Sequence, residues 1–336
     1  MESTAQGENW AFAIVTQTLP YAVFACVTAR LFGGKCDMAL EWAWLRGRES
    51  REAPGDDSCP TPGVYPHVLL LHGLTGSPTE LAYVARRLRL AGRSTVWCPR
   101  LVNHGEPLNV LARTRSGQLY ESARSYFLTA KQAADNAGVP LVVGGLSLGA
   151  VLALLLAAEF PAAIAGIICL APTFFYDGWN VPWLHRMIPL VDYTPLKYFA
   201  YFREESPYGL KDEFLRKRVA RAYEGVALRD NDYFGQHGYA HFPIRLLCES
   251  RHLIARCVSA LRHVKAPLLV VQALHDDATS PRNSHHVFEN VGSTQKELVL
   301  LDNSFHMVTA DLERERVASA MVRFCQQLHA KQNVRP

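Results

Sequence analysis

The stretch LVVGGLSLGAVLAL, residues 141–154, decides the fold. It opens with a short apolar run typical of a buried strand and ends in an apolar run that suits a helix. Between them lies a G-x-S-x-G motif, Gly145-Leu146-Ser147-Leu148-Gly149. A sharp turn between strand and helix exposes a serine hydroxyl above a sheet, and flanking glycines permit it because larger side chains would collide with neighbouring elements. The motif predicts Ser147 as a nucleophile; the alternative is an ordinary tight turn.

Similar apolar runs and helical patterns alternate outward from this motif. Near-continuous Val, Ile and Leu runs separated by helices are typical of a parallel sheet covered on both faces. The predicted fold class is therefore α/β, with a mostly parallel sheet flanked by helices. Strands are predicted at 67–71, 95–98, 141–144, 166–170, 268–272 and 298–301, and helices at 78–90, 116–136, 147–159, 284–291 and 312–329.

One long segment interrupts the alternation. The chain from 171 to 267 contains no predicted strand, and residues 174–242 hold 17 of the 34 aromatic residues. We predict a helical cap inserted at about 172–265, whose aromatic side chains line a ligand pocket. A second small core made of the same residues is the alternative. The predicted domains are an N-terminal helical extension with a linker, residues 1–62, and a main domain, residues 63–336.

A second loop with catalytic character follows the first predicted strand. The segment His72-Gly73-Leu74-Thr75-Gly76 is a glycine-flanked loop that leads into a helix. Such a loop can direct a backbone N–H toward a developing negative charge, and the residue after the nucleophile supplies the other N–H. The predicted oxyanion donors are therefore the backbone N–H groups of Leu74 and Leu148. His72 is expected to pack in the loop rather than transfer protons.

An acid and then a histidine follow the serine along the chain. This is the order expected of a catalytic triad whose serine lies on a turn between a strand and a helix. Asp276 comes just after the strand at 268–272, and His306 just after the strand at 298–301. The carboxyl ends of parallel strands meet at one edge of a sheet, so both side chains are expected near Ser147. His306 would move the serine proton, and Asp276 would orient and stabilise the imidazole. Asp277 is the rival acid; Asp276 is preferred because it lies one residue closer to the strand.

Together these motifs resemble the α/β-hydrolases, and most closely the bacterial carboxylesterases and monoacylglycerol lipases. The resemblance runs from about residue 65 to residue 329 and is carried by the segments HGLTG (72–76), GLSLG (145–149), QALHD (272–276) and SFH (304–306). It implies an α/β-hydrolase domain with a cap, a Ser147–His306–Asp276 triad, an oxyanion hole at Leu74 and Leu148, and no cofactor. Relatives commonly carry Phe where Leu74 stands, and their caps are shorter and less aromatic.

The expected function is hydrolysis of carboxylic esters through an acyl-enzyme, by a serine hydrolase acting on a small apolar substrate. The aromatic cap favours medium-chain acyl esters or monoacylglycerols. The same triad can serve amide hydrolysis, carbon–carbon bond hydrolysis or acyl transfer, and the sequence does not separate these reactions. The remaining alternative is a non-catalytic scaffold that uses the hydrolase fold for binding. The intact triad argues against it, because a binding protein does not need all three residues.

Composition excludes several classes of protein and partner. The chain has 336 residues, 49% of them hydrophobic, and a net charge of +4, which is too small and dispersed for a nucleic-acid binder. Eight cysteines without a CxxC pair indicate reduced thiols and a cytoplasmic protein. His237 and His241 have a spacing that could bind a metal on a helix, but nearby glycines argue against a helix, so no metal is expected. Neither a dinucleotide fingerprint nor a phosphate loop follows a predicted strand.

Residues 10–29 form an uncharged stretch of about the length of a membrane span. Thr16, Gln17, Thr18 and Pro20 dilute its hydrophobicity, and the preceding residues lack the positive charge of a secretion signal. We expect a helix that packs on the protein or lies on a membrane surface. A single membrane anchor and a cleaved signal are the alternatives.

Overall fold

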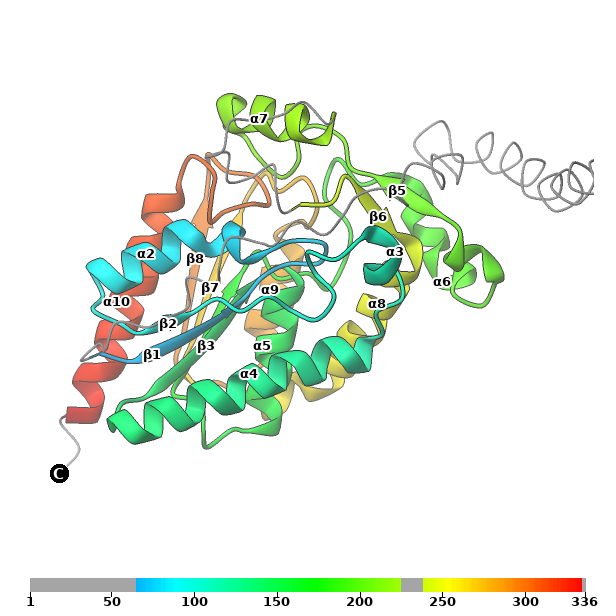
Figure 1. Ribbon diagram of the computed structural model, residues 1–336. Helices are drawn as coiled ribbons and strands as arrows, with labels where there is room; N and C mark the ends of the chain where they lie inside the picture. Colours follow the sequence, from blue (N-terminus) through cyan, green and yellow to red (C-terminus); the bar gives the residue numbers. More distant parts are fainter. Residues whose placement is uncertain (1–64, 225–237, 334–336) are drawn as a thin grey trace, which may run out of the picture.

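The computed structural model describes residues 65–224 and 238–333. The predicted extension at 1–62, with the stretch at 10–29, lies outside these residues. A six-stranded, fully parallel sheet with strand order β2-β1-β3-β4-β7-β8 forms the centre (Figure 1). The strands are β1 (His67–Leu71), β2 (Val96–Trp97), β3 (Leu141–Leu146), β4 (Gly166–Leu170), β7 (Leu268–Ala273) and β8 (Lys296–Leu301).

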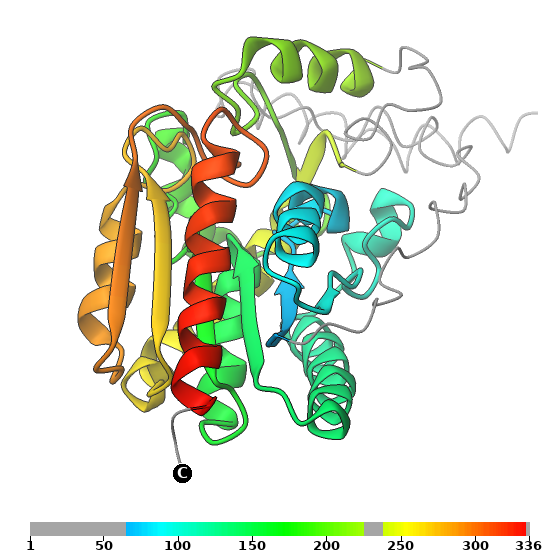
Figure 2. The same ribbon diagram turned by 90° about the vertical axis from the view of Figure 1, so that its left-hand side faces the viewer.

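Helices cover both faces of the sheet, which confirms the predicted architecture (Figure 2). One face packs against α2 (Ala82–Leu90) and α10 (Arg314–Asn333). The other packs against α4 (Ser116–Ala137), α5 (Leu148–Glu159), α8 (Ile244–Ala260) and α9 (Arg282–Asn290). The short elements η2 (Pro78–Leu81), α3 (Leu108–Leu111) and η5 (Leu261–His263) lie in the connections.

The alternation of side chains in the strands explains why both faces are buried. In β1, Val68 and Leu70 belong to the core beneath α2 and α10, whereas Leu69 and Leu71 belong to the core beneath α4 and α5. Successive side chains of a strand point to opposite faces, so a strand buried on both sides needs an unbroken apolar run. The helix α5 is buried along almost its whole length, because it lies between the sheet and the neighbouring helices α4 and α8.

The segment between β4 and β7 forms a cap above the carboxyl ends of the strands (Figure 1). It contains two short strands that the sequence did not predict, because three residues are too few to display an alternating pattern. Its last helix, α8, joins the helical layer beside α5, so that part of the segment predicted as insert packs against the core. The other elements are η3 (Trp183–Met187), α6 (Ile188–Val191), η4 (Pro195–Tyr198), β5 (Tyr201–Arg203), α7 (Glu213–Tyr223) and β6 (His241–Pro243).

Three further expectations from the sequence, on cysteines, membrane spans and metal ligands, bear on the described residues. Five cysteines there are free and buried, at positions 98, 169, 248, 257 and 325. No helix within 65–224 or 238–333 has both the length and the apolar character needed to cross a membrane. In the same two ranges no group of three or more potential ligands could hold a metal ion, and His237 of the predicted pair lies outside them.

Candidate active site

Ser147 occupies the sharp turn between β3 and α5. Its backbone adopts φ 56° and ψ −117°, and its N–H donates to the carbonyl of Leu170 at 2.9 Å. A positive φ is unfavourable for a residue with a Cβ atom and costs about 1–3 kcal/mol, which surrounding packing must offset. Such strain at a serine between a strand and a helix is the conformation that lifts the hydroxyl out of the sheet.

The two glycines of the motif are required by the close approach of β1 and of each other, since a Cβ atom at Gly145 would also lie 2.3 Å from the carbonyl carbon of Gly149. A Cβ atom at Gly145 would lie 2.6 Å from the carbonyl oxygen of Leu71, and one at Gly149 would lie 2.0 Å from the same oxygen. Both distances are far inside van der Waals contact, so a side chain would push β1 away. The glycines therefore bring the loop that follows β1, with Leu74, beside the Ser147 turn.

His306 and Asp276 form a directly hydrogen-bonded pair at the carboxyl ends of β8 and β7. The imidazole Nδ1 lies 2.9 Å from Oδ2 and 3.1 Å from Oδ1 of the carboxylate. Asp276 is only 2% exposed. Its oxygens accept from the N–H groups of Ala278 and Thr279 and from the amide of Gln272, at 2.7–2.8 Å. These donors fix the position of the carboxylate, which in turn fixes the ring that it contacts.

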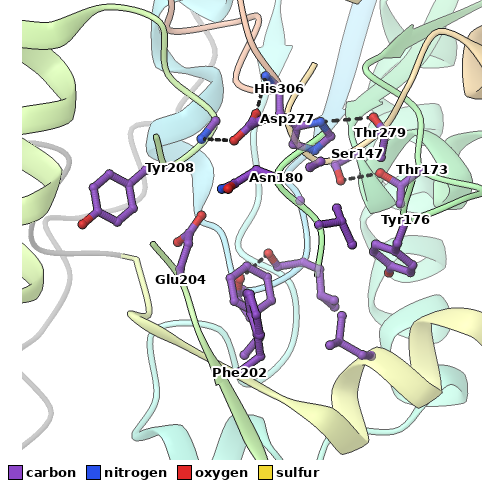
Figure 3. A pocket seen from close by; sticks show the side chains of 18 of the residues that line it. Ser147, Thr173, Tyr176, Asn180, Phe202, Glu204, Tyr208, Asp277, Thr279 and His306 are labelled. Atoms are coloured by element: carbon purple, nitrogen blue, oxygen red, sulfur yellow. Dashed lines mark hydrogen bonds between the residues drawn. The ribbon is translucent and has the colours of Figure 1, made fainter. Parts of the chain in front are cut away.

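Asp277, the rival acid, is hydrogen-bonded to backbone groups instead of the imidazole. Its carboxylate accepts from the backbone N–H of His306 at 3.2 Å and from that of Gly209 at 3.1 Å (Figure 3). It thus connects the histidine loop to the cap, and among the described residues no hydrogen bond joins it to the imidazole. Burial raises the pKa of Asp277, and the neighbouring Asp276 raises it further.

Ser147 and His306 line one cavity of about 300 Å³, together with Thr173 and Thr279. The Ser147 hydroxyl is hydrogen-bonded to that of Thr173 at 2.8 Å (Figure 3). Within the described chain no hydrogen bond joins it to His306. The structure therefore brings together two of the three predicted triad members by direct contact and places the third in the same cavity. Loose hydrogen bonds to a catalytic base are common in enzymes without substrate.

The predicted oxyanion donors flank the serine. Leu148 is the first residue of α5, so its N–H has no acceptor within the helix. The loop carrying Leu74 is fixed on both sides: the Gly73 N–H donates to Glu80 at 3.1 Å, and the Gly76 N–H donates to the Gly73 carbonyl at 3.3 Å. His72 is buried and supports this loop, since its Nε2 accepts from the Leu101 N–H at 3.0 Å and its Nδ1 lies 2.9 Å from the Gly73 carbonyl oxygen.

The cavity has an apolar part and an acidic part. Side chains of the cap form the apolar part, namely Tyr176, Ile188, Leu196, Phe242 and Leu247. Glu80 and Glu204 lie in the acidic part with Tyr208 and Tyr223, and the Tyr223 hydroxyl donates to Glu204 at 2.8 Å. No lysine or arginine is among the lining residues that the structure describes. Burial raises the pKa of both glutamates to about 7.

Several residues of the cavity lie in no sequence motif and were not predicted. Thr173, Thr279, Glu80, Glu204 and Tyr223 come from separate loops and cap elements and meet only in the folded chain. Thr173 and Thr279 have one weak signal, because each lies just after a core strand, at the edge where Ser147 and His306 lie. Glu80 and Glu204 have none.

Electrostatics at His306 lead to a prediction about pH. Burial lowers the pKa of the imidazole, but the charge and hydrogen bond of Asp276 outweigh burial, and Asp277 and Glu80 add to them, so the pKa is raised to about 9. A general base must be neutral, so kcat/KM for an uncharged ester is expected to rise about tenfold per pH unit and to level off near pH 9. The measurement is a pH–rate profile of kcat/KM.

The Glu80→Gln variant tests whether Glu80 contributes to the raised pKa of His306. Loss of this carboxylate removes a charge that favours the imidazolium, so the acidic limb of the profile should move to lower pH. Glu121→Gln, on the outer surface of α4, is the matched control and should leave the limb in place. An unchanged limb in Glu80→Gln would show that Glu80 does not act on His306.

Comparison with known proteins identifies the family of the chain. A family model described as serine aminopeptidase, S33, matches residues 64–313. The chain belongs to this family and is an α/β-hydrolase. The hydrolase is 26% identical over 257 residues to a thermostable monoacylglycerol lipase of Bacillus sp. (strain H-257), covering 76% of this chain and 89% of that one. It is 24% identical over 261 residues to a carboxylesterase of Bacillus subtilis (strain 168), covering 78% and 92%.

Solved structures show the same fold. A structure from a study of the metagenome-derived lipolytic enzymes LipS and LipT superposes with a TM-score of 0.66 at 24% identity, covering 82% of this hydrolase and all of that chain. A soluble variant of monoglyceride lipase from Saccharomyces cerevisiae, in complex with a substrate analog, gives a TM-score of 0.67 at 16% identity, covering 80% and 89%. The family match and the curated relatives, rather than the fold alone, place this α/β-hydrolase among the hydrolases of the lipase and esterase type, as the sequence predicted.

Proposed function

We propose that the enzyme hydrolyses carboxylic esters with apolar acyl groups through a covalent acyl-enzyme on Ser147. The observation that carries the proposal is the Asp276–His306 pair, whose imidazole lines one cavity with a serine on a strained turn. In this mechanism the Ser147 hydroxyl turns from Thr173 toward His306, gives up its proton and attacks the ester carbonyl. The N–H groups of Leu74 and Leu148 stabilise the oxyanion.

The remaining steps of the reaction use the same groups. The imidazolium of His306 returns the proton to the departing alcohol, and Asp276 stabilises the charged ring meanwhile. Water then enters, loses a proton to His306 and attacks the acyl-enzyme. Fatty acid leaves and the Ser147 hydroxyl is restored. Every step uses protein groups and water.

The two parts of the cavity support a choice of substrate. Tyr176, Ile188 and Leu247 suit an acyl chain, whose burial contributes about 0.8 kcal/mol per methylene. The acidic part, with Glu204, suits an alcohol that can donate hydrogen bonds and disfavours a carboxylate or phosphate on the leaving group. Medium-chain esters of a polyol such as glycerol meet both conditions. The name of the Bacillus relative, a monoacylglycerol lipase, is consistent with this choice.

A two-part substrate series tests the proposal. With p-nitrophenyl esters from acetyl to palmitoyl, kcat/KM is expected to peak at medium chain length, because the apolar part of the cavity can bury only a limited length of acyl chain. With one medium acyl group, the monoacylglycerol should have a lower KM than the methyl ester, because only the former has hydroxyls for Glu204. Best activity on acetate with a decline beyond it would contradict the apolar acyl site. Activity on amides alone would contradict ester hydrolysis.

A further inference from the structure

The oxyanion loop, residues 73–76, directs the Leu74 N–H through contacts around the preceding residue. Among the described residues no hydrogen bond engages this N–H. The carbonyl of the same peptide group, that of Gly73, accepts from the Gly76 N–H at 3.3 Å and lies 2.9 Å from Nδ1 of His72. The N–H and C=O of a trans peptide point in opposite directions, so contacts that fix this carbonyl also fix the Leu74 N–H. Thr75 adopts φ 59°, which is unfavourable for a β-branched residue, so the loop keeps its shape only where its neighbours hold it.

The Glu80 carboxylate holds the beginning of the oxyanion loop. Its Oε2 accepts from the Gly73 N–H at 3.1 Å. A Cβ atom at Gly76 would overlap with Oε1, so the carboxylate lies directly against the loop backbone. A Cβ atom at Gly73 would lie 3.5 Å from Oε2 and also 3.5 Å from the Cβ atom of Ser147. Glu80 thus contacts the oxyanion loop at the point where this loop passes the nucleophile.

Glu80 is itself anchored to the loop that carries His306. The hydroxyl of Thr309, three residues beyond His306, donates to the Glu80 carbonyl at 2.6 Å. Thr309 is fully buried, and the two hydrogen-bonded residues are 229 positions apart in the sequence. Glu80 also lies in η2, where its N–H donates to the Ser77 carbonyl at 3.1 Å. One residue therefore joins the oxyanion loop to the loop of the general base.

We propose that Glu80 is a positioning residue for the oxyanion hole. Its carboxylate holds Gly73 so that the Leu74 N–H faces the position of the oxyanion, and its carbonyl keeps the oxyanion loop aligned with His306. The inference rests on the proposed acyl-enzyme mechanism. The role requires a hydrogen-bond acceptor at position 80 and no charge, so it is separable from the effect of the Glu80 charge on His306.

The kinetic consequence depends on when the oxyanion forms. Negative charge on the carbonyl oxygen develops in the transition state, so a misplaced donor lowers kcat and leaves KM nearly unchanged. Loss of one oxyanion donor typically costs about a hundred- to a thousandfold in kcat. A displaced Leu74 N–H keeps part of its effect, so we expect a smaller loss, about ten- to a hundredfold.

The experiment compares Glu80→Gln with Glu80→Met in the full-length protein. Both variants lose the charge and keep a side chain of similar length, but only glutamine has an oxygen that accepts from the Gly73 N–H. Rates on a p-nitrophenyl ester are measured on the alkaline plateau, where the protonation of His306 no longer limits them. Glu80→Met should lose about ten- to a hundredfold in kcat, with KM within about threefold of wild type. Glu80→Gln should keep kcat within about threefold of wild type.

Labelling of Ser147 by a fluorophosphonate gives the same comparison without an ester, because the phosphonyl oxygen occupies the oxyanion position. Glu80→Met should be labelled about tenfold or more slowly than Glu80→Gln. Equal kcat and equal labelling rates in the two variants would overturn the proposal. A change confined to KM would also overturn it, because Glu80 would then bind substrate. Wild type that is labelled but hydrolyses no ester would refute ester hydrolysis, and the labelling rates would still decide the role of Glu80.

Two further variants distinguish this role from a loss caused by misfolding. Glu121→Met, on the exposed surface of α4, is the matched control for the substitution and should equal wild type. Thr309→Val removes the hydroxyl that holds the Glu80 carbonyl and leaves the carboxylate in place. Its kcat should fall about three- to tenfold at unchanged KM, in a protein that thermal unfolding shows to be folded. An unchanged kcat in Thr309→Val would overturn the link between the two loops.

Discussion

Replacing Ser147 by alanine is expected to lower kcat/KM for a p-nitrophenyl ester on the order of a thousandfold or more. The hydroxyl is the only protein group in the mechanism that forms a bond to the acyl carbon, so its removal leaves just the oxyanion donors and binding. The φ of 56° at this position disfavours alanine as it does serine, so the fold should be retained. Initial rates and thermal unfolding of the two proteins provide the measurement.

Thr173→Ala is the matched control for Ser147→Ala. It removes the neighbouring hydroxyl that now holds Ser147 at 2.8 Å, and it leaves the proposed nucleophile in place. Its kcat/KM should stay within about tenfold of wild type, since freeing Ser147 allows it to reach His306. A thousandfold loss in Thr173→Ala, or a small loss in Ser147→Ala, would contradict the assigned role of Ser147.

Replacing Asp276 by asparagine should reduce kcat by about a thousand- to ten-thousandfold. The carboxylate contacts His306 Nδ1 through both oxygens, at 2.9 and 3.1 Å. An amide at this position cannot stabilise the imidazolium, and its NH₂ group can hold the ring in the wrong tautomer. The pKa of His306 should also fall, because Asp276 is the largest cause that raises it. Steady-state kinetics across pH measure both effects.

Asp277→Asn separates the two neighbouring acids. Asp277 accepts from the backbone N–H groups of His306 and Gly209, and an asparagine oxygen can still accept a hydrogen bond from such a group. Its kcat is expected to stay within about tenfold of wild type, with a lower melting temperature as the main change. If Asp277→Asn lost as much activity as Asp276→Asn, the assignment of Asp276 as the orienting acid would be wrong.

The core of the fold could be predicted from sequence because its signals are local. Each of the six strands contains a short apolar run, and β1 and β4 have the predicted bounds, 67–71 and 166–170. The helices beside them carry long periodic patterns. The signal for the nucleophile turn is equally local. Gly145 and Gly149 indicate a close approach of two backbone segments, although the sequence does not say that the second segment is β1.

The contacts of the site could not be read in the same way, because they join residues far apart in sequence. Glu204 and Tyr223 are 19 positions apart and neither lies in a motif, yet they form one hydrogen-bonded wall of the cavity. The partner of Ser147, Thr173, depends on where the chain runs after β4. The cap strands β5 and β6 pair across 37 residues that intervene between them, and three-residue strands carry no pattern.

Covalent labelling with a fluorophosphonate, followed by peptide mass mapping, tests the central claim most directly. An activated serine beside its general base attacks the phosphorus of such a reagent, whereas ordinary serines do not react. Modification of Ser147 in the folded wild type is expected, with none at Ser147 in the His306→Ala variant. Absence of labelling at Ser147 in the folded wild type, or labelling of another serine in its place, would contradict a serine hydrolase built on Ser147, His306 and Asp276.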